Sequence, residues 1–168
     1  GATDKNGNAA SILDGGESHR VLQCINEEGA DTTFENLVIQ NGSASGEYPD
    51  NFGGGMYNVN SSPTLTNCSF ENNSAEGNGG GMYNENNSPT LTNCSFLENN
   101  SVGGGGGGMV NWESSPTLTN CSFENNSSRG GGGMANVRIF DATLTNCSFE
   151  NNSSTIDGGG IVNVQIPT

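Results

Sequence analysis

Apolar residues alternate with polar ones in short stretches that recur along the chain. In residues 64–71, Leu65, Cys68 and Phe70 are apolar and stand among Thr, Asn, Ser and Glu. The alternation has a period of two, broken once at Asn67, which is typical of short strands with one buried face. Asn tolerates the left-handed backbone conformation, so we expect Asn67 to turn the chain between two strands.

This stretch occurs four times, and a second landmark recurs with it. The four cysteines of the repeat are 26, 27 and 26 residues apart: Cys68, Cys94, Cys121 and Cys147. A Gly run followed by an apolar residue recurs at spacings of 26, 27, 25 and 27, which gives Met56, Met82, Met109, Met134 and Ile161. A degenerate copy at residues 33–43 aligns Phe34, Leu37 and Ile39 with Leu65, Cys68 and Phe70. A fixed period of this length is the signature of a solenoid.

The repeat predicts strands rather than helices, because Gly, Asn, Ser and Pro are all poor helix formers. We expect three short strands and three corners per coil, with the Gly run as a flexible corner. One coil cannot bury its own apolar face, whereas stacked coils can. The sequence therefore predicts an all-β parallel β-helix of about six coils of about 26 residues. It forms a single domain over 1–168, with a divergent N-terminal coil at 1–32 and regular repeats at 33–168.

Stacking would place equivalent side chains in columns. Leu, Cys, Phe and Met would fill the interior, and the cysteines would be buried, reduced thiols, because parallel Cβ vectors suit a disulfide badly. Two columns consist of Asn, whose amides can hydrogen bond to the coils above and below. We expect these ladders to satisfy buried polar groups at the corners. The members of the first column are Asn36, Asn67, Asn93, Asn120 and Asn146. Those of the second are Asn58, Asn84, Asn111, Asn136 and Asn163.

The motifs resemble a known family. The F-x-x-N pairs at 70–73, 96–99, 123–126 and 149–152 and the runs GGGM at 79–82 and GGGI at 158–161 are similar to the repeat of polymorphic outer-membrane proteins. Gly replaces the Ala of that repeat, and Met mostly replaces its aliphatic residue. The resemblance covers roughly residues 33 to 168 and implies a right-handed parallel β-helix outside the cell, with adhesive or structural duty. The wider class also resembles pectate-lyase-like helices, although none of their catalytic motifs is matched.

Charge and composition narrow the range of functions. The chain has 168 residues, four Lys and Arg against 18 Asp and Glu, and a net charge of −14. No basic patch can form, so we expect no nucleic acid partner. No stretch approaches the length of apolar residues that spans a bilayer, so we expect no membrane span.

We expect no enzyme, and therefore no catalytic residue, cofactor or metal site. The Asp residues are scattered, and His19 is the only histidine. We expect an outward column of carboxylates at Glu71, Glu124 and Glu150. An inserted Leu97 should displace Glu98 from this column. We interpret this column as a solvated acidic face that keeps the rod soluble.

The Thr pairs at 64/66, 90/92, 117/119 and 143/145 predict a flat outward grid. Such a grid resembles the ice-binding face of some β-helices, but Thr is also a common outward strand residue. The first coil has Thr33 and Glu35 instead, which would spoil an ice-binding plane. Ice binding is therefore one alternative function.

The two ends of the chain suggest self-assembly. Pro167-Thr168 aligns with Pro63-Thr64, and residues 8–16 resemble a late strand of a preceding coil, so the ends are complementary in phase. We expect head-to-tail stacking into a homopolymeric extracellular or cell-surface fibre, with 1–16 as donor segment and 161–168 as acceptor edge. The predicted assembly residues are Ala9, Ala10, Ser11, Ile12, Leu13, Ile161, Val162, Val164 and Ile166. The alternative is a piece of a longer surface adhesin that binds a receptor or glycan through loops such as 44–52.

Overall fold

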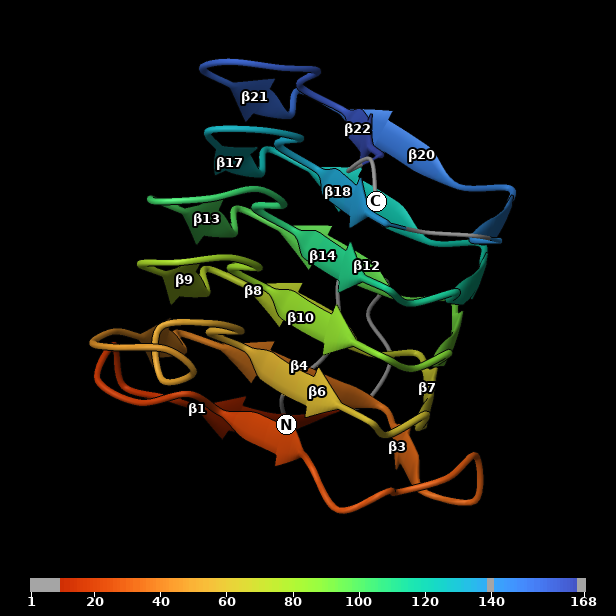
Figure 1. Ribbon diagram of the computed structural model, residues 1–168. Helices are drawn as coiled ribbons and strands as arrows, with labels where there is room; N and C mark the ends of the chain where they lie inside the picture. Colours follow the sequence, from red (N-terminus) through yellow and green to blue (C-terminus); the bar gives the residue numbers. More distant parts are fainter. Residues whose placement is uncertain (1–9, 139–140, 166–168) are drawn as a thin grey trace.

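The computed structural model describes residues 10–138 and 141–165, which form a parallel β-helix (Figure 1). Every strand pairs in parallel with the equivalent strand one coil away. Two of the sheets contain six strands, which confirms the predicted number of coils. Each complete coil contains four strands, so the expectation of three was wrong. The extra strand has only two residues, too few for an alternation to show in the sequence.

Each sheet is named here after its position in the coil. The Thr sheet contains β3 (Thr33–Glu35), β7 (Thr64–Thr66), β11 (Thr90–Thr92), β15 (Thr117–Thr119) and β19 (Thr143–Thr145). The Phe sheet contains β1 (Ser11–Asp14), β4 (Leu37–Gln40), β8 (Ser69–Glu71), β12 (Ser95–Leu97), β16 (Ser122–Glu124) and β20 (Ser148–Glu150). The short sheet contains β5 (Ser43–Ala44), β9 (Ser74–Ala75), β13 (Asn100–Ser101), β17 (Ser127–Ser128) and β21 (Ser153–Ser154). The Met sheet contains β2 (Leu22–Cys24), β6 (Met56–Val59), β10 (Met82–Glu85), β14 (Met109–Trp112), β18 (Met134–Val137) and β22 (Ile161–Val164).

Left-handed residues turn the chain at the corners. The predicted Asn67 column has φ between 52° and 55° throughout, at Asn36, Asn67, Asn93, Asn120 and Asn146. A second left-handed residue follows the Phe sheet, at Asn41, Asn72, Glu98, Asn125 and Asn151. A third precedes the Met sheet, at Gly53, Gly79, Gly106 and Gly131, and a fourth follows it, at Asn60, Asn86, Glu113 and Arg138. Asn is enriched at such positions because its short side chain can hydrogen bond locally.

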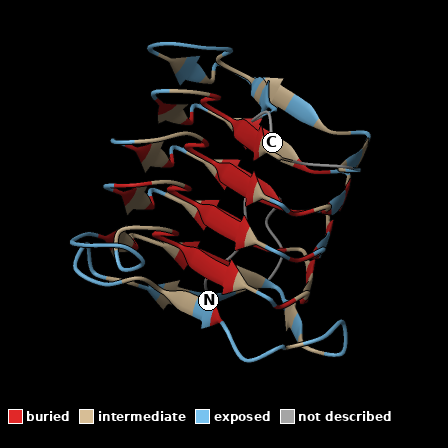
Figure 2. Ribbon diagram, viewed as in Figure 1, coloured by how far each residue is buried: buried red, intermediate tan, exposed pale blue. Residues whose placement is uncertain are grey.

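The interior columns are those that the repeat predicts. Leu65, Leu91 and Leu118 lie opposite one another in register, as do the Met and Phe residues. The interior Leu, Phe and Met residues of the middle coils are 0% exposed. Figure 2 shows the buried residues in the middle coils and mainly exposed or intermediate ones in the first and last coils. Adjacent rings from Phe70 to Phe149 stack with centroids 4.6–4.7 Å apart. Burial of these side chains supplies the main driving force for folding.

Leu97 is a substitution and not an insertion. It pairs with Glu71 on one side and with Glu124 on the other, so it occupies the acidic column itself. Glu98 takes the left-handed corner with φ 56°. Leu97 therefore displaces Glu98 from the column as expected, but by a substitution, so the expectation of an insertion was wrong. The extra residue between Cys94 and Cys121 lies elsewhere in the coil, where the Gly run is longest.

The Gly runs do more than provide a corner. Of the three Gly directly before β6, β10, β14 and β18, only the first is left-handed, as at Gly79, and the next two lie against the neighbouring coil. A Cβ on Gly81 would stand 2.5 Å from the carbonyl oxygen of Gly108, and one on Gly108 would stand 2.6 Å from that of Gly133. The runs let adjacent backbones approach more closely than any side chain permits.

Candidate functional site: the ladders and the open ends of the rod

One predicted Asn ladder runs inside the rod along the Met sheet. The Nδ2 of each Asn donates to the Oδ1 of the next coil, at 3.1 Å from Asn58 to Asn84 and at 2.9 Å from Asn84 to Asn111, Asn111 to Asn136 and Asn136 to Asn163. All donors point towards the C-terminal end. The Oδ1 of Asn58 is buried without a partner at the other end of the ladder, where Cys24 occupies the same column. The ladder therefore has a polarity, with an unused acceptor at its N-terminal end.

The other predicted ladder exists but lies on the surface. Each Nδ2 donates back to the preceding coil, from Asn67 to Asn36, Asn93 to Asn67, Asn120 to Asn93 and Asn146 to Asn120, over 3.1–3.3 Å. Asn93, Asn120 and Asn146 are exposed and Asn67 is half-buried. The expectation that this column satisfies buried groups was wrong, because the left-handed corner turns the side chain outward.

A third ladder was not predicted. It consists of the last residue of each F-x-x-N motif, and its Nδ2–Oδ1 distances are 2.9–3.0 Å, at Asn73, Asn99, Asn126 and Asn152. Each Nδ2 also donates to the carbonyl of a Phe-column residue one coil earlier, as Asn99 does to Phe70 at 2.9 Å. The Oδ1 of Asn99, Asn126 and Asn152 also accepts the backbone N–H of the preceding ladder member, and that of Asn73 accepts the N–H of Gly42. The invariant position of Asn after Phe in all four motifs was the signal that could have revealed it.

The cysteines are free, and those of the inner coils are buried. The Sγ of Cys94 lies 3.5 Å from the carbonyl oxygen of Thr92 and 3.7 Å from that of Leu65, so the thiol can donate to the backbone as well as fill space. Hydrogen bonds with the thiols of Cys121 and Cys68, together with burial, raise the pKa of Cys94 well above its ordinary value. Burial and the nearby Glu28 carboxylate raise the pKa of Cys24 to about 11. Cys147, in the last coil, is only partly buried.

The lower burial of Cys147 predicts that thiol reagents modify it selectively. In the unassembled protein, we expect a neutral maleimide to modify Cys147 at least about tenfold faster than the other four thiols, because access of the reagent limits reactivity and Cys147 is the one thiol that is not buried. Burial raises the pKa of Cys147, so its rate should rise with pH through the neutral range. Peptide mass mapping after timed labelling would measure both effects, and all five thiols should react in denaturant. Equal native labelling of Cys94 and Cys147 would contradict the buried column.

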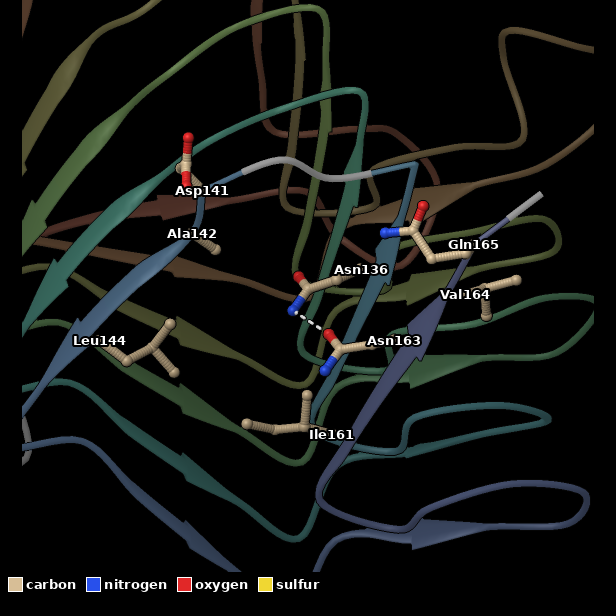
Figure 3. A pocket seen from close by; sticks show the side chains of 8 residues that line it. All are labelled: Asn136, Asp141, Ala142, Leu144, Ile161, Asn163, Val164 and Gln165. Carbon is tan, nitrogen blue, oxygen red and sulfur yellow. Dashed lines mark hydrogen bonds between the residues drawn. The ribbon is translucent and has the colours of Figure 1, made fainter. Parts of the chain in front are cut away.

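The C-terminal end of the described rod is open. Its four edge strands are β19, β20, β21 and β22, each the last of its sheet. Ile161 is 37% exposed, whereas Met134, one coil below, is fully buried. A hollow of about 460 Å³ opens there, with Leu144 on one side and Ile161 and Asn163 on the other (Figure 3). This surface is a cross-section of the core, and its strand edges can accept a further coil.

The N-terminal end presents a matching cross-section. The edge strands are β1, β2, β3 and β5, and Leu13, Leu22 and Phe34 are partly buried interior residues there. Leu13 pairs with Ile39 in the Phe column, and Leu22 pairs with Met56 in the Met column. The first described strand belongs to the Phe sheet and the last to the Met sheet. The described chain therefore begins and ends at different points of the coil.

The predicted assembly residues are divided by this geometry. Ser11, Ile12 and Leu13 lie in β1, with Ala10 just before it, and Ile161, Val162 and Val164 lie in β22. Leu13 and Ile161 face the core, whereas Ile12, which is 48% exposed, and Val162 and Val164 belong to outward columns. Ala9 and Ile166 lie outside the described residues.

The remaining candidate chemistry is spread over the outer surface. The Thr pairs stack in register from β7 to β19, and Glu35 takes the outer position of β3. His19 is exposed on the loop after β1. Within residues 10–138 and 141–165, no three His, Cys, Asp or Glu side chains gather as a metal site. The same residues include no helix long and apolar enough to cross a membrane.

Comparison with known proteins agrees with this architecture. No curated protein and no solved structure matches the chain significantly. A family model described as the right-handed β-helix region matches residues 6–165, nearly the whole chain. Domains with this fold are commonly parts of secreted or surface proteins, which supports a structural or surface-protein role. The chain belongs to the right-handed β-helix family.

Proposed function

We propose that this protein is a non-enzymatic structural element of the cell exterior whose molecules stack end to end. The observation that carries the proposal is the C-terminal cross-section of the described residues, where Ile161 is exposed and Leu144 and Phe149 are only partly buried beside the four edge strands. A second molecule, offering its own edge strands and Leu13, Leu22 and Phe34, would bury these side chains. Burying one such side chain contributes roughly 1.5–3 kcal/mol.

The polarity of the rod makes this contact heterologous. The C-terminal edge of one molecule meets the N-terminal edge of the next, and this arrangement leaves one free end of each kind. Contacts of this type grow into open filaments when they do not close into a ring. The parallel strands would continue across the junction, as in other cases of strand addition.

Charged substitutions at the two ends test the proposal. Leu13→Lys should block the N-terminal end and Ile161→Lys the C-terminal end, since each places a charge on a core cross-section. We expect fibres from the wild type in negative-stain microscopy and single particles from either variant alone. An equimolar mixture of the two should give dimers, because each variant keeps the end that the other lacks. Stacking should also protect Cys147 from maleimide.

The matched control is Thr119→Lys, which places the same charge on the outward Thr grid and should leave fibres intact. A wild type that stays monomeric at high concentration would overturn the proposal. Dimers in either single variant would instead indicate sideways association.

A further inference from the structure

The outer face of the Met sheet differs from those of the other three sheets. The outward positions of the others are mainly Thr, Ser and Glu. On the Met sheet they are Tyr57, Tyr83, Val110, Ala135 and Val162 in one column, and Val59, Glu85, Trp112, Val137 and Val164 in the next. Tyr57, Tyr83, Val110 and Ala135 form a second apolar cluster, separate from the core, against which Val59, Trp112 and Val162 pack. Strands with one solvated face alternate between apolar and polar residues. Here both faces of the strands are mainly apolar, which is typical of a sheet that is covered on both sides.

The chain covers only part of this face. Phe52, from the loop at 44–52, packs on Tyr83 with ring centroids 4.7 Å apart, and Tyr48 packs on Phe52. Beyond them two adjoining cavities remain. One of about 290 Å³ lies between Tyr48, Phe52, Glu85 and Trp112. The other, of about 250 Å³, lies over β14, β18 and β22.

Both cavities touch Trp112 and Asn78, so they adjoin along the outer face of the Met sheet and together cross successive coils; we name the pair the Met-sheet groove. Its floor is aromatic and aliphatic. Its rim carries separate polar groups, among them Asn78, Glu85, Arg129 and Asp157. Tyr48 and Ile156, at its margin, are 61% and 63% exposed.

The positive charges of the described chain gather at this face. Arg20 lies over the Tyr57 ring, 4.6 Å from its centroid, and donates to the carbonyls of Pro49 and Phe52, which holds the loop in place. Arg138 lies 5.6 Å from the Trp112 centroid and pairs with Glu113 at 3.0 Å. Arg129 lines the second cavity. In a chain with a net charge of −14, the groove is therefore a region where charges of both signs balance.

We propose that the Met-sheet groove binds an extended, neutral glycan chain. A sugar ring has an apolar C–H face that packs on an aromatic ring and hydroxyl edges that hydrogen bond to a polar rim. The groove offers both, with Trp112 at its centre, which is the usual make-up of a ligand site. It crosses several coils, so it suits a linear polymer better than a compact ligand. The strong negative charge of the rest of the surface disfavours a polyanionic one.

This inference does not depend on end-to-end stacking, because the groove lies on the side of the rod and not at its ends. Trp112 is the only tryptophan of the chain, so its fluorescence reports on the groove directly. We expect cellohexaose, xylohexaose or mannohexaose to shift the Trp112 emission saturably. An oligogalacturonate of equal length should have a much smaller effect. No response to any of the three neutral hexasaccharides, or a stronger response to oligogalacturonate, would overturn the proposal.

Variants separate the groove from the fold. In native gels containing the polysaccharide of the responding sugar, Trp112→Ala should weaken retention at least about tenfold, as removal of a central aromatic anchor does. Trp112→Phe should keep most of it. Val137→Lys, beside Trp112 in register, leaves the fluorophore in place and should abolish the emission shift. Thr119→Ala, on another sheet, should change neither readout. Full binding by Trp112→Ala and by Val137→Lys would place the ligand elsewhere and contradict the inference.

Discussion

Replacing Asn99 by Ala should lower the free energy of unfolding by about 4 kcal/mol, because four hydrogen bonds between buried groups are lost at roughly 1 kcal/mol each. The Asn99 side chain is 0% exposed. Its Oδ1 accepts from the backbone N–H and the Nδ2 of Asn73, and its Nδ2 donates to Phe70 and Asn126. Bulk solvent does not reach these bonds, because the side chain lies fully inside the rod. The expected fall in melting temperature is roughly 10 °C for a domain of this size.

The matched control is Asn93→Gly in the same coil. Asn93 belongs to the exposed ladder, so water can replace its bonds to Asn67 and Asn120, and Gly keeps the left-handed φ of 55° accessible. We expect a loss of about 1 kcal/mol or less. Thermal and urea unfolding, followed by circular dichroism, would compare the two variants. Equal losses would show that the interior ladder is not the stronger one.

Replacing Gly80 by Ala should be nearly as damaging, although it adds only one methyl group. That Cβ would stand 2.3 Å from the carbonyl oxygen of Asn100 and 2.7 Å from its backbone nitrogen. The obstructing atoms are backbone atoms at the start of β13, so they cannot move aside without disturbing the stacking of the coils. Overpacking of this kind costs about 3 kcal/mol or more when nothing can yield.

Gly29→Ala is the appropriate comparison for this variant. A Cβ at Gly29 meets nothing within 4 Å, and its φ lies outside the left-handed region. The substitution should be neutral or should stabilise by a few tenths of a kcal/mol to about 1 kcal/mol, through the unfolded chain. Chemical denaturation of both variants measures the difference. A mild effect at Gly80 would show that adjacent coils can separate locally to admit a side chain.

The sequence alone determined the architecture. The alternation around Leu65, Cys68 and Phe70, repeated at a fixed period, leaves a parallel β-helix as the arrangement that buries every copy in the same way. The interior columns and two of the three Asn ladders follow from that period, because stacking places equal residues over one another. The outward direction of the Thr grid follows from the same alternation.

The tertiary structure decided features that the period of the sequence repeat does not specify. Asn93 is itself the left-handed corner residue, and its side chain points outward. Asn99 follows a corner residue, and its side chain points inward. The positions of Asn in the sequence do not distinguish the two. The space above Gly80 depends on the backbone of the next coil, which no local pattern records. The Met-sheet groove depends on a loop at 44–52 that folds over Tyr83 and stops short of Trp112. Local alternation fixes which side of a strand is apolar, but only contacts between distant segments fix how much of that side stays open.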